Sequence, residues 1–195
     1  VTVQPSGHQF SCEADETVLA AAIRAGVGLP YGCKNGACGS CKGKVISGSV
    51  QHKAHQQRAL TPEEEAAGFS LFCCATASDD LVIEAREVAG SSDYPIKKMP
   101  SRVTTMEKVA PDVVVLTLQL PASERLQYRA GQYIEIMLRD NKRRSYSMAS
   151  APAEGSPVTL HIRHIPGGLF TDQVFGTMKE RDILRFEGPM GTFFL

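Results

Sequence analysis

The sequence predicts an α+β fold made of two small domains, and three observations support this prediction. Residues 1–90 mix short strand signals with two helix signals. Residues 91–100 hold two prolines and no hydrophobic periodicity, so we expect a semi-rigid linker there. From residue 101 to residue 195, apolar runs of strand length recur at short intervals, which is typical of a small antiparallel β-barrel.

The first domain opens with a predicted hairpin and a predicted helix. Residues 1–4 and 8–12 have strand character and flank a Pro-Ser-Gly turn sequence. Thr17 is a suitable N-cap for a helix over residues 18–25, because its hydroxyl can accept a hydrogen bond from the first turn. Gly26 then supplies the residue that ends this helix.

The rest of the first domain alternates strand and helix signals. Residues 44–50 have the pattern of a strand that runs into a turn. Thr61 is followed by proline and glutamates, which predicts an N-cap and a short helix over residues 62–68. Residues 69–73 are apolar, and residues 81–83 are the predicted closing strand.

Four cysteines follow the ligand spacing of an iron–sulfur cluster. Three of them are spaced Cys-x4-Cys-x2-Cys within residues 33–41, and a further cysteine pair lies far downstream. In plant-type [2Fe-2S] sites, four thiolates with this spacing share two irons. The residues between the first three are small, so backbone N–H groups can approach sulfur and influence the reduction potential. The predicted metal ligands are Cys33, Cys38, Cys41 and one of the neighbours Cys73 and Cys74, which spacing does not distinguish.

Other interpretations of the cysteines and histidines are weaker. A structural zinc site usually shows two Cys-x2-Cys pairs, whereas after Cys41 this chain offers only two adjacent cysteines. A disulfide framework does not suit a chain this large, with no secretory segment. Cys12 lies within a strand signal, so we predict a buried structural thiol. His52 and His55 fall in a polar stretch and are predicted to be surface histidines.

The second domain begins with clear strand patterns. Residues 113–118, 133–138 and 158–163 are strand-length runs, and the last two alternate apolar and polar positions. A turn is predicted at residues 140–141, and residues 144–147 follow it as a further strand edge. Several short strands at this spacing favour a small antiparallel barrel.

Two polar motifs in the second domain are typical of nucleotide binding. Strand alternation places Arg144 and Tyr146 on one side and Ser145 and Ser147 on the other. Residues 167–175 form a glycine-rich turn that opens a helix. Such a turn offers free N–H groups and the positive end of the helix dipole to a diphosphate.

Taken together, Arg-x-Tyr-Ser and the later Gly-x-x-Thr resemble the FAD-binding barrel of the ferredoxin-NADP reductase superfamily. The resemblance implies that Arg144 pairs with the flavin diphosphate, Tyr146 lies against the isoalloxazine ring, and Ser147 hydrogen-bonds near N5. It therefore makes Tyr146 and Ser147 the catalytic candidates. Threonine in place of the commoner serine keeps the hydroxyl, and residues 131–133 and 188–191 also look like barrel turns of this family. The implied cofactor-binding residues are Arg144, Ser145, Tyr146, Ser147, His161, Ile162, Arg163, Gly167, Gly168, Leu169 and Thr171.

The first domain resembles plant-type ferredoxin and the ferredoxin modules of oxygenase reductases. In those proteins the last ligand lies eight residues before the apolar start of the final strand, and counting back from Leu81 gives Cys73. The resemblance implies a β-grasp fold with the cluster in a loop near the surface. The order of the two modules is similar to bacterial oxygenase reductases and to CDP-6-deoxy-delta-3,4-glucoseen reductases, which residues 38–45 match well.

This resemblance implies an iron-sulfur flavoprotein reductase. Its cofactors would be a [2Fe-2S] cluster and FAD, and it would pass electrons from NAD(P)H to a protein acceptor such as an oxygenase or a sugar dehydratase. Family members continue into a nicotinamide-binding lobe that has no counterpart here, so we expect a fragment that NADH reduces slowly. The sequence does not decide whether the flavin is FAD or FMN, or whether the electron donor is NADH or NADPH. The alternative function is a non-enzymatic ferredoxin-type electron carrier whose barrel serves only for docking.

Composition limits the partners that we expect. A formal net charge of zero gives no reason to expect nucleic acid, and no apolar run is long enough to cross a membrane. Residues 1–90 carry 7 Lys and Arg against 10 Asp and Glu, whereas residues 91–195 carry 14 against 11. An acidic domain beside a basic one is compatible with docking between domains or with a partner. Thiolates that bind iron need a reducing compartment, so we expect a cytoplasmic protein.

Overall fold

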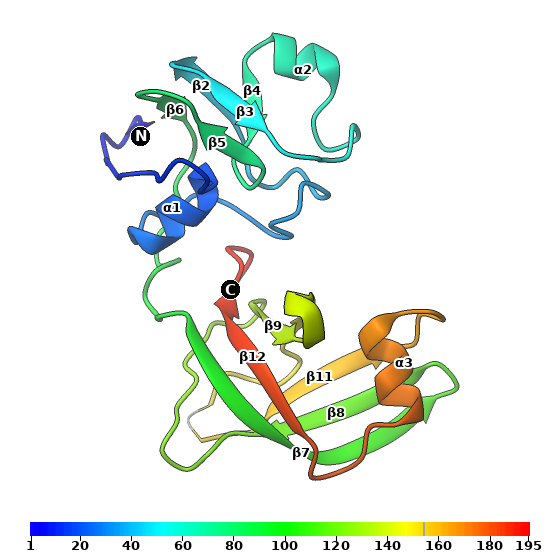
Figure 1. Cartoon of the computed structure of the whole chain (residues 1–195). Coiled ribbons are helices and arrows are strands. Elements are labelled where there is room, and N and C mark those ends of the chain that lie inside the picture. Colours follow the sequence, from blue (N-terminus) through cyan, green and yellow to red (C-terminus); the bar gives the residue numbers. More distant parts are fainter. Residues whose placement is uncertain (154) are drawn as a thin grey trace. The chain divides into compact units, whose positions relative to one another are not determined.

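The computed structural model describes residues 1–153 and 155–195 of the chain (Figure 1). Strands dominate it and the helices are few and short, which confirms the predicted α+β class. No described helix has both the length and the apolar character needed to span a membrane. Contacts divide the chain into a first unit, Val1–Asp93 with Gly191–Phe193, and a second unit, Tyr94–Met190 with Phe194–Leu195.

The first unit is a β-grasp arrangement of a mixed sheet and a helix. Its main sheet has the strand order β1-β6-β2-β4, in which β1 pairs in parallel with β6 and the other pairs are antiparallel. Strands β3 and β5 form a separate antiparallel pair. The elements are β1 (Thr2–Gln4), α1 (Val18–Arg24), β2 (Lys42–Ser47), β3 (Val50–His52), α2 (Pro62–Ala66), β4 (Phe69–Leu71), β5 (Ala75–Ala77) and β6 (Val82–Glu84).

The predicted helix signals of this unit are confirmed. The Thr17 hydroxyl accepts a hydrogen bond from the Ala20 N–H at 3.2 Å, and Gly26 has a φ of 74° after the last turn of α1. Helix α2 starts with a full capping box between Thr61 and Glu64. The predicted opening hairpin forms in part: Val3 donates to His8 and Phe10 to Val1 across the turn, and a bridge from Thr2 to Gln9 stands where a second strand was expected. Strand β1 also pairs in parallel with β6.

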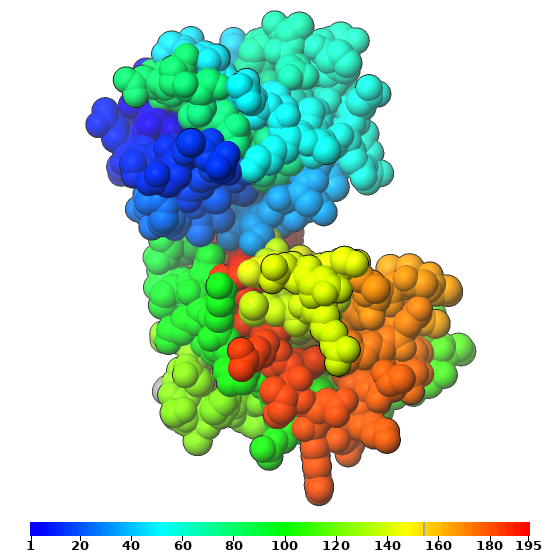
Figure 2. Space-filling model, viewed as in Figure 1, coloured from blue at the N-terminus to red at the C-terminus, as the bar shows by residue number. Residues whose placement is uncertain are grey.

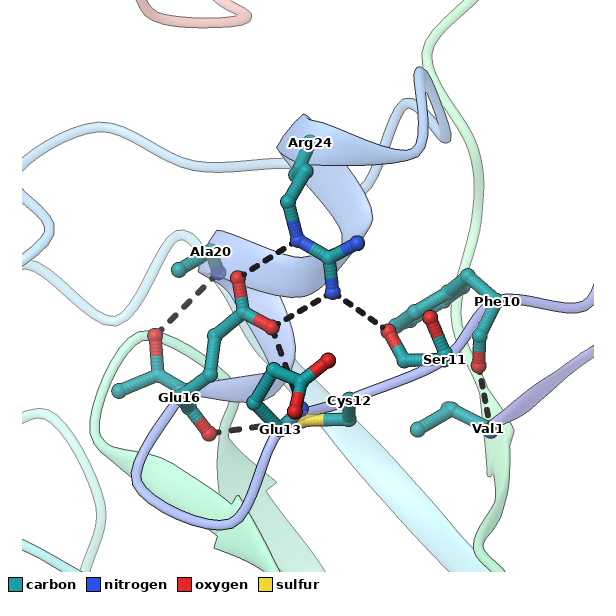
Figure 3. Close-up of polar contacts among 9 residues, drawn as sticks. Val1, Phe10, Ser11, Cys12, Glu13, Glu16, Ala20 and Arg24 are labelled. Carbon is teal, nitrogen blue, oxygen red and sulfur yellow. Dashed lines mark hydrogen bonds and ion pairs between the residues drawn. The ribbon is translucent and has the colours of Figure 1, made fainter.

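An ion pair ties the loop before α1 to the last turn of that helix (Figure 3). The Arg24 guanidinium donates to both carboxylate oxygens of Glu16, at 3.0 and 2.7 Å, and to the backbone carbonyl of Ser11 at 3.0 Å. The hydrogen bond from Arg24 holds the pKa of Glu16 below its usual range. The guanidinium therefore links this loop to the last turn of the helix.

We expect the Arg24→Gln variant to lower the midpoint of thermal unfolding at neutral pH by at most about a few degrees, because the pair is exposed. A carboxyl with a depressed pKa stabilises the fold above its unfolded pKa, and that contribution disappears as the pH falls through the folded value. The difference in unfolding midpoint between Arg24→Gln and the parent chain should thus become smaller at acid pH. Circular dichroism melts at neutral and acid pH measure it, with the exposed Arg86→Gln as a control; a gap that is constant with pH would contradict this account.

The second unit is an antiparallel barrel of six strands, as predicted. The strand order is β10-β9-β12-β7-β8-β11, and a bridge between Met148 and Leu160 joins the two outer strands, which closes the sheet. Buried side chains such as Leu116, Ile134 and Phe186 fill its interior. The elements are β7 (Lys97–Ala110), β8 (Val113–Gln119), β9 (Tyr133–Met137), the 3-10 turn η1 (Arg139–Asn141), β10 (Arg143–Ser147), β11 (Val158–Arg163), α3 (Leu169–Gly176) and β12 (Ile183–Met190).

Two sequence predictions for this unit need correction. Residues 97–100, predicted as linker, are the start of β7 and pair with β12. Pro100 is tolerated there because β8 joins β7 only from Arg102 onwards, so one side of the strand is an edge at that position. Residues 188–190, predicted as part of a turn, lie in β12, and only Gly191 after them takes a positive φ.

Candidate functional site

The four predicted cluster ligands lie close together in the first unit as two pairs of thiols. The Cys38 thiol hydrogen-bonds to that of Cys33, and the Cys41 thiol hydrogen-bonds to that of Cys73. Among the described residues, no group of three or more His, Cys, Asp or Glu side chains is arranged so that it could hold a metal ion. Two pairs are the donor set that two irons need, so these residues fit a [2Fe-2S] cluster, and their assignment as ligands stays a prediction.

Backbone N–H groups point at all four sulfurs, as the small loop residues predicted. Hydrogen bonds of this kind favour the thiolate form and are one influence on a cluster's reduction potential. The donors are Gly36 to Cys73 Sγ at 3.3 Å, Ala37 to Cys33 Sγ at 3.4 Å, Ser40 to Cys38 Sγ at 3.5 Å and Cys73 to Cys41 Sγ at 3.5 Å.

Gly36 shows why the loop needs glycine. Its φ is +72°, a conformation that other residues rarely adopt. A Cβ atom there would lie 2.6 Å from the Cβ of His55 and 2.7 Å from the Sγ of Cys74. The backbone of the cysteine loop therefore packs directly against the segment that carries His55 and against the second thiol of the downstream pair.

The thiol pKa values follow the hydrogen bonds. The hydrogen bond from Cys41 lowers the pKa of Cys73 to about 6. Burial opposes the change at Cys38, but hydrogen bonds from the hydroxyl and N–H of Ser40 still lower its pKa to about 7. The partner of Cys73 shows the opposite effect, since the pKa of Cys41 is raised by the shared hydrogen bond and by burial. Each pair thus contains a thiol that readily becomes a thiolate ligand.

Cys74 lies beside the predicted ligands and shares a sulfur–sulfur hydrogen bond with Cys73. Its Sγ is 3.6 Å from that of Cys73, and burial raises its pKa to about 12. Cys12, predicted as a structural thiol, is half-buried, and its thiol donates to the backbone carbonyl of Glu16 at 3.4 Å. Burial also raises the pKa of Cys12. The geometry of the site thus favours Cys73 over its neighbour as the fourth ligand.

His52 was predicted to be a surface histidine, and this was wrong for its side chain, which is only 10% exposed. One ring nitrogen lies 2.8 Å from Glu65 and the other 2.8 Å from the buried hydroxyl of Ser70. The partners come from α2 and β4, which the sequence does not show to be neighbours of β3. His52 therefore links three elements of the first unit.

Thr192 is a residue of the site that the sequence analysis missed. Its hydroxyl accepts a hydrogen bond from the Tyr31 N–H at 2.8 Å and donates to the Tyr31 carbonyl at 3.1 Å. Tyr31 lies two positions before Cys33, so Thr192 holds the start of the cysteine loop. The two residues are 161 positions apart, and no local signal could have revealed the contact.

In the second unit, the predicted flavin residues of β10 lie on an exposed strand edge. Arg144 is exposed, and its guanidinium donates to the neighbouring Arg143 carbonyl at 2.7 Å. Tyr146 is half-buried with its ring centroid 5.4 Å from that of Phe170, and burial raises the pKa of its hydroxyl. Ser145 and Ser147 are exposed. The Tyr146 ring thus connects this strand edge to the first turn of α3.

The glycine-rich turn opens α3 as predicted, but its side chains act within the turn. The Thr171 hydroxyl is buried and donates to the Ile165 carbonyl at 2.8 Å. The Asp172 carboxylate, which the sequence analysis did not single out, accepts from the Gly167 N–H at 3.1 Å and contacts His164 at 2.9 Å. Gly168 is required, since a Cβ there would lie 2.4 Å from the Thr171 hydroxyl. An anion at this turn would therefore meet backbone N–H groups and an adjacent carboxylate.

The remaining predicted flavin residues are more dispersed. Continuing the register of the Met148–Leu160 bridge places the exposed His161 beside Ser147. Ile162 is fully buried in the barrel core, so only its backbone can face a ligand. Arg163 is paired with Asp112 at 3.0 Å and its side chain is 80% exposed. Leu169 lines a hollow of about 830 Å³ beside η1.

An exposed arginine, a half-buried tyrosine face and a glycine-rich helix start therefore meet in one region of the barrel. These groups fit a flavin nucleotide by their chemistry. A guanidinium matches a phosphate, an aromatic face matches the ring system, and helix N–H groups match a diphosphate.

Comparisons with known proteins match both domains. The model of the 2Fe-2S iron-sulfur cluster binding domain matches residues 1–78, and the model of the oxidoreductase FAD-binding domain matches residues 100–195. CDP-6-deoxy-L-threo-D-glycero-4-hexulose-3-dehydrase reductase of Yersinia pseudotuberculosis is 37% identical over the whole chain. Terephthalate 1,2-dioxygenase reductase component 1 of a Comamonas species is 35% identical, again over the whole chain.

A solved structure also resembles the whole chain. The cytochrome P450 reductase GcoB of Amycolatopsis matches it with a TM-score of 0.84 and 34% identity. The chain covers 58% of GcoB, 58% of the Yersinia protein and 57% of the Comamonas protein, so it spans less than two thirds of these relatives. With a cluster-binding domain followed by a FAD-binding barrel, the chain belongs to the ferredoxin-NADP reductase superfamily, in the group whose members begin with a plant-type [2Fe-2S] ferredoxin domain.

Proposed function

We propose that this chain forms the electron-transfer part of an iron-sulfur flavoprotein reductase. The complete protein would take electrons from NAD(P)H and pass them through FAD and a [2Fe-2S] cluster to a protein acceptor, such as an oxygenase or sugar dehydratase component. The relatives named as reductases of a dehydrase and of a dioxygenase support this range of acceptors. The observation that carries the proposal is that the sulfurs of four cysteines in one unit all accept backbone N–H groups, in a chain whose other unit matches a FAD-binding domain.

In this proposal the cysteine loop holds the cluster. Cys33 and Cys38 would bind one iron, and Cys41 and Cys73 the other, because the thiols are paired in this way. The N–H groups of the loop would stabilise the thiolates, and Thr192 would fix the entry of the loop through Tyr31. The cluster supplies transfer of single electrons when it is bound.

The barrel would hold the flavin through β10 and the start of α3. Arg144 would bind a phosphate, while Tyr146 would support the ring system, braced by Phe170. Ser147 would offer its hydroxyl to the reactive part of the ring, and His161 would border it. Since the Thr171 hydroxyl is already used within the turn, the diphosphate contacts near Gly168 would come from backbone N–H groups. Bound FAD would supply the ability to accept two electrons as a hydride and to release them one at a time.

The setting of the protein follows from the same chemistry. We propose a cytoplasmic location, because free thiols must stay reduced until iron binds them. The division into a cluster domain at residues 1–90 and a flavin domain at residues 101–195 stays a prediction, although β7 begins inside the predicted linker.

The test is an analysis of the purified chain for both cofactors. We expect visible absorption of a [2Fe-2S] protein, about two irons and about two acid-labile sulfides per chain, and a released flavin that chromatography identifies as FAD. Sulfide without flavin would support the electron-carrier alternative and refute the reductase. A colourless protein that binds zinc would refute both.

A further inference from the structure

The segment around the cysteine loop has an unusual charge pattern. Residues 31–60 contain five Lys and Arg side chains and two histidines but neither Asp nor Glu. All 10 carboxylate residues of residues 1–90 lie outside this segment, which we call the basic segment. The first 90 residues carry a net charge of −3, so the positive charge of the basic segment is local and opposite to that of its surroundings.

The fold brings residues 53–59 of the basic segment against the cysteine loop and Cys74. The Gln56 N–H donates to the Gly36 carbonyl at 3.0 Å, and the Lys53 N–H donates to the Cys74 carbonyl at 2.8 Å. A Cβ on Gly39 would lie 3.5 Å from the Ala59 carbonyl, so this part of the chain also packs on the loop. Figure 2 shows that much of the basic segment, in light blue and cyan, lies on the surface.

Two cations sit next to these contacts and are exposed. Arg58 precedes Ala59, and Lys53 makes the backbone contact to Cys74 itself. The Lys53 ammonium donates to a backbone carbonyl, that of Asp15, at 3.1 Å, and its charge offsets part of the rise that burial causes in the pKa of Cys74. Lys42 differs from both, because Glu64 neutralises it at 2.6 Å. Lys53 and Arg58 are therefore two exposed cations of the basic segment beside the cysteine loop.

Cys38 is exposed at the surface of the cysteine loop. Cys38 is the exposed cysteine of the four predicted ligands, whereas Cys41 and Cys73 are buried. An acceptor must come close to an exposed ligand for electrons to leave the site. Gly39, the residue after Cys38, packs on Ala59, and Arg58 is the neighbour of Ala59 in the chain. Complementary charge steers such encounters and suppresses wrong partners.

We propose that the basic segment is the docking surface for the electron acceptor, and that the acceptor presents a carboxylate-rich face to it. This inference rests on the proposed reductase function and adds the chemistry of the partner. The partner is a protein whose docking face carries Asp and Glu around its own redox centre. If the cations served only to balance the negative charge of a bound cluster, removing them would shift the reduction potential and leave the choice of partner unchanged.

The test measures binding of the full chain, with its cofactors, to two redox proteins of opposite charge. The probes are oxidised cytochrome b5, which is acidic, and oxidised cytochrome c, which is basic, each immobilised for surface plasmon resonance. The variants are Lys53→Glu with Arg58→Glu and, as a matched control, Arg86→Glu, which changes an exposed arginine of the same unit outside the basic segment. Potentiometric titration of each protein accompanies the binding data.

We expect the parent chain to bind cytochrome b5 more tightly than cytochrome c at low salt, with the preference fading near about 150 mM salt. The double variant should bind cytochrome b5 on the order of tenfold more weakly and cytochrome c more tightly, while Arg86→Glu behaves like the parent. The docking proposal would be overturned if the parent chain bound both cytochromes equally, or if Arg86→Glu weakened binding as much as the double variant does. It would also be overturned if the double variant shifted the reduction potential and left binding unchanged. A chain without sulfide would refute the reductase function and the docking together, whereas a cluster-bearing chain with no charge preference would refute only the docking.

Discussion

The Cys73→Ala variant is expected to purify without its iron–sulfur cluster. Cys73 accepts the Gly36 N–H and shares a hydrogen bond with Cys41, so its loss leaves one of the two thiol pairs incomplete. Changes around metal ligands typically weaken metal binding by about 10-fold to 100-fold, and loss of a ligand is more severe. Bound iron, acid-labile sulfide and the visible spectrum should all fall by more than about tenfold from the parent values.

Cys74→Ala is the matched control for this prediction. It removes the same thiol from a residue that is equally buried and adjacent in the chain. Because Cys74 lacks the backbone N–H donor that Cys73 has from Gly36, we expect the control variant to keep its iron and sulfide. Cluster loss in Cys74→Ala but not in Cys73→Ala would exchange the two assignments, and retention in both would show that neither thiol is required.

The cysteine loop was predictable because its information is local. The spacing of three ligands, the small residues between them and the two helix caps can all be recognised over a few positions. The contacts that hold the loop in place are distant, as Thr192 with Tyr31 shows. The environment of His52 was missed for the same reason, because Glu65 and Ser70 reach it only when β3, α2 and β4 assemble.

In the barrel, too, local features could be predicted from the sequence and contacts between distant residues could not. Apolar runs of strand length predicted β8, β9 and β11 with nearly correct bounds, because strand patterning is a local property. The start of β7 was taken for a linker because residues 91–100 hold two prolines, although Met99 among them is buried. Sequence also could not show that the Thr171 hydroxyl closes the turn at Ile165, which leaves only the backbone there for a diphosphate.

Replacement of Arg144 by alanine is expected to weaken flavin binding by about 10-fold to 100-fold, while the barrel keeps its stability. The guanidinium is exposed, and among the described residues its hydrogen bond goes to the carbonyl of its own neighbour, so the fold gains little from it. A hydrogen bond to a charged group contributes about 1.5–3 kcal/mol, which corresponds to this change in affinity. Fluorescence titration of the flavin-free protein with FAD measures the affinity, and thermal unfolding without flavin measures the stability.

The neighbour Lys142 supplies the control. Lys142→Ala removes another exposed cation just before β10, so it changes the net charge equally without touching the predicted phosphate ligand. Unchanged FAD affinity in Lys142→Ala beside weakened affinity in Arg144→Ala would assign the loss to one guanidinium. Equal losses in both would mean that the flavin responds to the general positive charge of the barrel. A drop in the unfolding midpoint of flavin-free Arg144→Ala would instead give this arginine a structural role, which its exposed position on the strand edge argues against.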